Sequence, residues 1–127
     1  MTTAGGDGDR ELLERAEAIA TRAYAPYSRY LVGAAVRTRD GQVFAGANVE
    51  NAAYPLGVCA ERSALARAVG DGYRPGDVEA IAITASPCGG CRQWLHEFRI
   101  DRVVFRLRGD VVSRSPADLL PDVWDEL

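Results

Sequence analysis

Residues 78–85 read VEAIAITA, an apolar run that has the length of a β-strand. A strand that is apolar along its whole length is typical of the middle of a sheet that is covered on both faces. Gly70 and Gly72 precede the run and suit a helix end, whereas Pro87 follows it and suits the first turn of a helix. The run therefore predicts a central strand with helices on either side of it.

The segments around this strand complete the predicted fold. Apolar residues at helical spacing predict an amphipathic helix near the N-terminus, with Asp9 as its cap. Asp40-Gly41 and Gly109-Asp110 each separate two β-prone segments, as hairpin turns do. The predicted order is a helix from residue 9, strands 31–38 and 42–47, helix 59–69, strand 78–85, helix 87–98, strands 102–108 and 111–113, and a closing turn 115–119. This alternation predicts an α/β protein in which a mixed five-stranded sheet lies between helices as the middle of three layers.

Length and composition predict a single domain. With 127 residues, of which 47% are hydrophobic, the chain can bury one core. Residues 1–8 are small, polar and rich in glycine, so we expect a disordered leader there and one domain over 9–127. A net charge of −3 argues against nucleic acid as a partner. The sequence shows neither a long apolar run nor a signal-peptide pattern, so we expect a cytoplasmic protein that does not bind membranes.

The three cysteines of the chain predict a zinc site. Cys59 begins one predicted helix, and Cys88 and Cys91 stand at C-x-x-C spacing where another begins. An odd number of cysteines at this spacing fits metal binding in a reducing compartment better than disulfides. Three protein ligands leave one position of a tetrahedral zinc ion open to water, as catalytic sites do. We therefore expect one Zn²⁺ per chain; the alternative is that the cysteines are small buried hydrophobic residues.

Two charged residues follow the first cysteine directly. Glu61 stands two positions after Cys59 and is a candidate for the catalytic acid and base beside the zinc. Arg62 is a candidate donor to the ligand sulfurs, because three thiolates around a divalent cation leave a negative charge to offset. The alternatives are an ordinary acid on a helix surface and an arginine in a surface salt bridge.

In these motifs the chain resembles the small, three-cysteine form of the cytidine deaminase family, and the resemblance covers nearly all of the predicted domain. Four blocks carry it in the order of the family: Tyr27-Ser28-Arg29-Tyr30-Leu31-Val32-Gly33-Ala34-Ala35, Asn48-Val49-Glu50-Asn51-Ala52-Ala53-Tyr54, Cys59-Ala60-Glu61-Arg62 and Pro87-Cys88-Gly89-Gly90-Cys91-Arg92-Gln93. The resemblance implies the cytidine deaminase fold, a homotetramer with its sites near subunit interfaces, and hydrolytic deamination of free cytidine and deoxycytidine in pyrimidine salvage.

The resemblance also implies which residues hold the substrate. Residues that match Asn48 and Glu50 bind the ribose hydroxyls, although in this sequence the two could merely satisfy a local turn. Tyr30 matches an aromatic residue of the base pocket that is more usually phenylalanine, and Ala60 places backbone groups near the ring. Trp124 stands where a phenylalanine closes over the base, often from a neighbouring subunit; it could instead anchor the C-terminal tail in a groove.

Two other functions are compatible with the same motifs. The first is a deaminase of aminoacyl-nucleoside antibiotics such as blasticidin S, which shares the zinc chemistry; the run Asn48-Val49-Glu50-Asn51 favours the nucleoside enzyme. The second is a noncatalytic, zinc-stabilised binding module in which Glu61 is merely polar surface. Editing of polynucleotides is disfavoured, because the chain is acidic and lacks added basic or aromatic segments.

Overall fold

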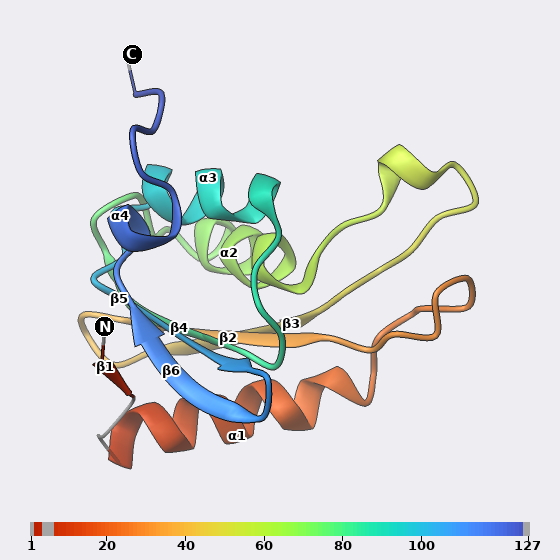
Figure 1. Cartoon of the computed structure of the whole chain (residues 1–127), viewed down its shortest axis with the longest axis horizontal. Coiled ribbons are helices and arrows are strands. Elements are labelled where there is room, and N and C mark those ends of the chain that lie inside the picture. Colours follow the sequence, from red (N-terminus) through yellow and green to blue (C-terminus); the bar gives the residue numbers. More distant parts are fainter. Residues whose placement is uncertain (1, 4–6, 126–127) are drawn as a thin grey trace.

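The computed structural model describes residues 2–3 and 7–125 of the 127-residue chain. Its elements follow in the predicted order (Figure 1). They are β1 Thr2–Thr3, α1 Asp7–Ala20, β2 Gly33–Thr38, β3 Val43–Ala47, the 3-10 turn η1 Tyr54–Leu56, α2 Ala60–Gly70, β4 Val78–Ile83, α3 Gly89–Glu97, β5 Arg102–Leu107, β6 Asp110–Arg114 and α4 Pro116–Leu119. None of the helices in the described part of the chain is both long and apolar enough to cross a membrane.

The strands form one sheet in the order β1-β6-β5-β4-β2-β3. β4 lies parallel to β5, with α3 as the connection between them, and the other neighbouring strands are antiparallel. The predicted mixed five-stranded sheet is therefore confirmed as β2 to β6, and the two-residue β1 extends it at the β6 edge. β3 forms the opposite edge, where the guanidinium of Arg67 in α2 donates to the carbonyl oxygen of Ala45.

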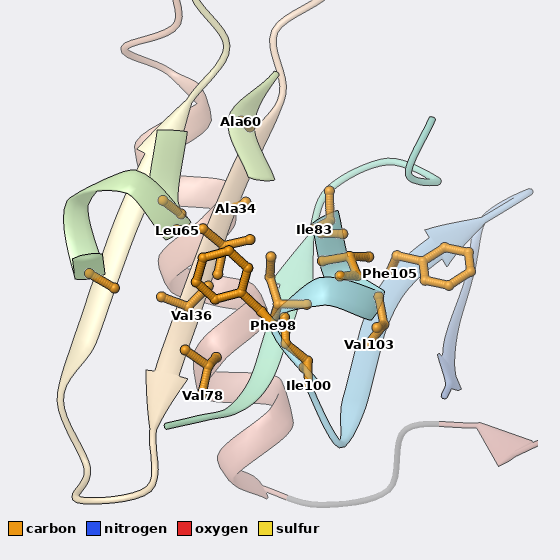
Figure 2. Close-up of a cluster of buried hydrophobic side chains, with 14 of the residues drawn as sticks. Ala34, Val36, Ala60, Leu65, Val78, Ile83, Phe98, Ile100, Val103 and Phe105 are labelled. Carbon is orange, nitrogen blue, oxygen red and sulfur yellow. The ribbon is translucent and has the colours of Figure 1, made fainter. Parts of the chain in front are cut away.

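Helices cover both faces of the sheet, as the apolar run 78–85 predicted. α1 lies across one face, and α2 and α3 lie across the other (Figure 1). Along β4, Ile81 and Ile83 pack in the cluster under α2 and α3, whereas Ala80 and Ala82 pack in the cluster under α1. Successive side chains of a strand point to opposite faces, so this single strand contributes to both layers of the core. Figure 2 shows the larger cluster, whose labelled members include Leu65 of α2 and Val36 of β2.

Two glycines let the helices lie close to the sheet. A Cβ atom on Gly33, the first residue of β2, would lie 1.9 Å from the carbonyl oxygen of Ala16 in α1. A Cβ atom on Gly46 of β3 would lie 2.5 Å from the backbone nitrogen of Ala64 in α2. Both distances are far below van der Waals contact, so the spacing of the three layers depends on glycine at these two positions.

The N-terminal segment differs from the sequence prediction of a disordered leader over 1–8. Thr2 pairs with Ser113 of β6, and α1 begins at Asp7; residues 1 and 4–6 lie outside the described part of the chain. Asp9 therefore lies inside the helix and is not its cap. Its side chain is buried, and its charge is paired there: Arg102 donates to the carboxylate at 2.9 Å, and Arg37 lies 3.7 Å away. Asp9 therefore pairs with arginines of the sheet instead of capping α1.

Candidate metal and active site

Two helices begin at cysteines and bring them together. Cys59 is the N-cap of α2 and Cys88 is the N-cap of α3, whose first turn also carries the buried Cys91. The backbone N–H of Cys91 donates to Cys88 Sγ at 3.4 Å. Free N–H groups and the dipole at a helix N-terminus favour negative charge, so both helix starts favour thiolates. Pro87 directly precedes Cys88, the N-cap of α3. It therefore lies outside the helix, although the sequence predicted it in the first turn.

The geometry of the sulfurs fits one zinc ion. The sulfur atoms of Cys59, Cys88 and Cys91 all lie within 4.8 Å of one another, and those of Cys59 and Cys88 are 3.8 Å apart. Sulfurs that share a tetrahedral zinc ion at bonds of about 2.3 Å are about 3.8 Å apart. The cysteines are free thiols rather than a disulfide pair. A set of three sulfur donors at these distances is suited to Zn²⁺, which thiolates bind strongly.

Hydrogen bonds within the cluster favour the thiolate of Cys59. They lower the pKa of Cys59 to about 5, first because Cys91 donates to it and then because Arg62 lies beside it. The same bond between the sulfurs raises the pKa of Cys91, and burial raises it further. The cluster therefore places its negative charge first on Cys59, the sulfur that Arg62 contacts.

Glu61 lies in the first turn of α2 and is 4% exposed. Burial raises the pKa of this carboxyl group above its usual range, and the charge of Cys59 raises it further; its own backbone N–H, Cys91 and Arg62 act in the opposite direction. A buried carboxyl group beside a metal site is a candidate to accept and donate protons there. These properties are those that a proton carrier at the site needs.

Arg62 reaches the cysteine cluster from the same turn. Its Nη2 donates to Cys59 Sγ at 3.2 Å, and this bond is the main reason for the raised pKa of the guanidinium. Its Nε atom is buried and has no hydrogen-bond partner among the residues that the structure describes. A guanidinium that donates to a ligand sulfur withdraws charge from it, which is the role that the sequence suggested; that role stays a prediction.

A cavity of about 500 Å³ opens beside the cluster. Its lining includes Cys59 and Arg62 as well as the segments 27–28 and 48–51. Of the predicted substrate residues, Asn48 and Glu50 border this cavity. The structure therefore brings the zinc site and the predicted sugar-binding residues to a single hollow, one that is large enough for a small organic ligand.

Asn48 and Glu50 both hold the segment that enters β2. Asn48 Nδ2 donates to the carbonyl oxygen of Tyr30 at 2.9 Å, and its Oδ1 accepts from the N–H of Val32 at 2.8 Å. Glu50 accepts from the Ser28 hydroxyl and, through Oε1, from the N–H groups of Ser28 and Tyr27. The bond from the Ser28 hydroxyl is the main cause that lowers the pKa of Glu50, and the backbone bonds lower it further. Both side chains thus make hydrogen bonds to the backbone of the nearby turn, which is part of what the alternative interpretation expected.

Three predicted substrate residues do not line the cavity. Tyr30 and Trp124 are both 62% exposed. The segments around them are held through the backbone: Tyr30 by its bonds to Ser28 and Asn48, and Trp124 by a bond from Gln93 Nε2 to its carbonyl oxygen. Ala60 is buried over its whole surface, backbone included, and packs in the core, so its predicted contact with the pyrimidine ring stays a prediction.

Sequence reasoning assigned no role to Ser28, which lines the cavity and contacts Glu50. The sequence did hold a sign that Ser28 matters, because Ser28 belongs to the first of the four blocks that carry the family resemblance. The Nε2 atom of His96 in α3 is 3.7 Å from the carboxylate of Asp125.

Comparisons with known proteins agree with this fold and site. Residues 7–107 match the family model of the cytidine and deoxycytidylate deaminase zinc-binding region. A cytidine deaminase of Halalkalibacterium halodurans is 47% identical over 127 residues, which cover 91% of this chain and 94% of the relative. The crystal structure of a cytidine deaminase from Burkholderia pseudomallei superimposes with a TM-score of 0.84 at 48% identity, covering 91% of this chain and 98% of that one.

A second solved structure, of a cytidine deaminase from Mycobacterium tuberculosis, has a TM-score of 0.81 at 35% identity and covers 95% of this chain and 99% of that one. Together with the three-cysteine site, these matches define a zinc-dependent hydrolytic deaminase, which is an enzyme with one Zn²⁺ as its cofactor. The chain belongs to the cytidine and deoxycytidylate deaminase family.

Proposed function

We propose that this enzyme hydrolyses free cytidine and deoxycytidine to uridine and deoxyuridine with release of ammonia, as a step of pyrimidine salvage. One observation carries the proposal: Cys59, Asn48 and Glu50 all line a single cavity of about 500 Å³. A nucleoside has a reactive base at one end and a hydroxyl-bearing sugar at the other. The cavity offers a metal site for the base, and hydrogen-bond acceptors and donors for the sugar.

In this proposal Cys59, Cys88 and Cys91 hold the zinc ion. Zinc, when bound, supplies Lewis-acid activation of water. Glu61 accepts a proton from the attacking water and passes it to N3 of the pyrimidine ring. The bond from C4 to the water oxygen forms in this first step. Glu61 then carries the second proton to the amino group, the bond from C4 to nitrogen breaks, and ammonia leaves. The burial of Glu61 supports this role, because a raised pKa suits a group that protonates a leaving amine.

The sugar is read by Asn48 and Glu50. Each keeps unused hydrogen-bonding capacity after its contacts with 27–32, since an amide has four such positions and a carboxylate about four. Backbone groups of Ala60 contact the edge of the pyrimidine ring. A substrate without sugar hydroxyls would leave these polar groups partly unpaired, which disfavours free cytosine.

We extend the proposal to a homotetramer whose sites lie near subunit interfaces. Figure 1 shows the loops 21–32 and 48–58 projecting beyond the same end of the molecule. They carry most of the exposed large hydrophobic side chains among the described residues, namely Tyr24, Tyr27, Tyr30, Leu31, Val49, Tyr54, Leu56 and Val58. A patch of this kind supports a protein interface. In such an assembly Trp124 would reach the base pocket of a neighbouring copy, which fits its exposed position outside the cavity of its own chain. Tyr30 would line the base pocket beside Ser28 and Asn48, the two cavity residues to which its backbone is bonded.

The enzyme is further proposed to work in the cytoplasm as one domain over 9–127. Three free thiols at a metal site support a reducing compartment.

The test follows the ultraviolet absorbance of cytidine with purified enzyme. We expect the absorbance of cytidine to fall as uridine forms, the reaction to stop after zinc is removed with a chelator, and about one equivalent of zinc per chain to restore it. Blasticidin S is the comparison substrate. A large preference for the antibiotic, or turnover that persists in zinc-free protein, would contradict the proposal.

A further inference from the structure

Ser28 lies in the turn between α1 and β2, at the border of the cavity. The next residue, Arg29, has a φ of 60°, in the left-handed region that residues other than glycine seldom adopt. A turn in this conformation needs bonds that compensate for it. The bonds that Ser28 makes are therefore important for the local backbone as well as for the cavity.

The hydroxyl of Ser28 makes two bonds. It donates to Glu50 Oε2, and it accepts from the backbone N–H of Tyr30 at 3.0 Å. The backbone N–H of Ser28 donates to the other carboxylate oxygen of Glu50, Oε1, at 3.1 Å, and that of Tyr27 donates to Oε1 at 3.0 Å. Glu50 is thus held at both oxygens, and Ser28 is the residue that contacts both.

The bonds leave a defined acceptor on Glu50. A carboxylate has about four lone pairs, of which two on Oε1 and one on Oε2 are engaged by the turn. The remaining lone pair belongs to Oε2, the oxygen whose direction the Ser28 hydroxyl fixes. Without that hydroxyl the carboxylate would be held through Oε1 alone, and Oε2 would be free to turn toward solvent.

We propose that Ser28 is a positioning residue for sugar recognition, which aims Oε2 of Glu50 at one hydroxyl of the nucleoside sugar. The proposal rests on the proposed function and adds a residue that determines specificity to it. Ser28 does not touch the reacting atoms, so its effect falls on the binding of hydroxyl-bearing substrates and leaves the chemical step unchanged.

The experiment compares Ser28→Ala with the wild-type enzyme on two substrates, cytidine and 2′,3′-dideoxycytidine, which lacks both free ring hydroxyls of the sugar. With cytidine, we expect KM to rise roughly tenfold, because a hydrogen bond to a charged group is lost, while kcat changes by less than about twofold. With dideoxycytidine, we expect kcat/KM of the variant to equal that of the wild type within about twofold, because the hydroxyl that Glu50 binds is absent.

Two further variants separate positioning from structure. Ser28→Thr keeps a hydroxyl and is expected to restore most of the affinity for cytidine. Thr21→Ala removes a hydroxyl from the same connection; within the described part of the chain this hydroxyl bonds only the carbonyl oxygen of Ala18 in α1. This variant is expected to leave KM unchanged on both substrates. Circular dichroism and the melting temperature check folding, and because Ser28 is exposed no core packing is lost in its variants.

An equal penalty on both substrates, or an unchanged KM for cytidine, would overturn the role of Ser28 while the wild-type enzyme stays active. A wild-type enzyme that does not turn over cytidine at all would instead overturn the proposed function and this inference with it.

Discussion

At the scale of single residues, the site depends on where the helices α2 and α3 begin. Cys59 and Cys88 are cap residues, and Glu61 and Cys91 follow them within one turn, so the backbone fixes four functional groups before any side chain adjusts. The motif Cys59-Ala60-Glu61 could be interpreted from sequence because each step of it has a chemical reason. The bonds of Ser28 could not, since a serine in a turn has many possible partners and sequence shows none of them.

Glu61 carries the first prediction. Glu61→Ala should fold, keep about one zinc per chain and lose the deamination rate by a factor of roughly 10² to 10⁴, because proton transfer by a positioned group contributes that much. Steady-state kinetics and metal analysis of the same preparation measure both quantities.

Glu14→Ala is the control for this variant, because Glu14 is an exposed acid of α1 and should change neither quantity. Unchanged turnover in Glu61→Ala would refute the proton-transfer role and favour the noncatalytic binding module.

At the scale of elements, the order of helices and strands could be predicted because the periodicity of the apolar residues is strong. The strand within the run 78–85, β4 Val78–Ile83, is buried at every position except the half-buried Glu79. Both hairpins turn at the expected glycines, Gly41 and Gly109, which have positive φ. β1 could not be predicted, since two residues that pair with a sheet edge leave no periodic pattern. The start of α1 was misplaced because Asp9 resembles a cap but pairs with Arg102.

The close approach of α1 to β2 carries the second prediction. Gly33→Ala should lower the free energy of unfolding by about 1–3 kcal/mol or more, because the added Cβ would meet the Ala16 carbonyl oxygen at 1.9 Å and force the helix away. Urea denaturation followed by circular dichroism measures the change.

Gly70→Ala is the matched control, since a Cβ at Gly70 meets nothing within 4 Å. It should leave stability unchanged or raise it slightly by helix propensity. Equal losses in the two variants would refute the packing argument.

The third prediction concerns the connection between α3 and α4. Arg92 Nε donates to the carbonyl oxygen of Pro87 at 2.9 Å, and Nη1 donates to that of Leu119 at 2.9 Å, so one side chain joins the loop before Cys88 to the end of α4. Arg92→Met should release zinc faster, by roughly tenfold, because outer contacts of this kind orient metal ligands. A chromophoric chelator measures the rate of release.

The control is Arg74→Met, which also removes two bonds to carbonyl oxygens, at Val69 and Tyr73. It should leave zinc release unchanged even where it lowers the melting temperature. Identical release rates in wild type and Arg92→Met would show that the loop needs no such support.

At the scale of the whole molecule, sequence reasoning could define the zinc cluster and the sheet but not the full substrate pocket. The cysteines, Asn48 and Glu50 are brought together by one chain, whereas Tyr30 and Trp124 stay exposed and outside the cavity. A residue that acts in a neighbouring copy has no signature in the spacing of its own chain. This is the physical reason why the tetramer and its contribution to the pocket stay a prediction.

The loop surface carries the fourth prediction. Leu56 is 68% exposed, so Leu56→Asp should cost little in an isolated chain but should disrupt an interface built on this patch. Light scattering should give about four times the chain mass of 13.7 kDa for the wild type and a smaller assembly for the variant. Ala117→Asp, at an exposed position of α4, is the control and should stay assembled. A wild-type protein that scatters as a single chain would contradict the tetramer.

The bond between Arg67 and Ala45 has a consequence for how the protein keeps in storage. Strand β3 ends the sheet with VFAGA, five uncharged residues of the kind that recruit an extended segment from another molecule. The guanidinium of Arg67 donates to one carbonyl oxygen of this strand and brings a positive charge to it, so we expect Arg67 to oppose the pairing of a further strand at this edge. Loss of this arginine should therefore shorten the time for which a concentrated sample stays free of fibrils, although Arg67 is not among the residues assigned to the chemistry.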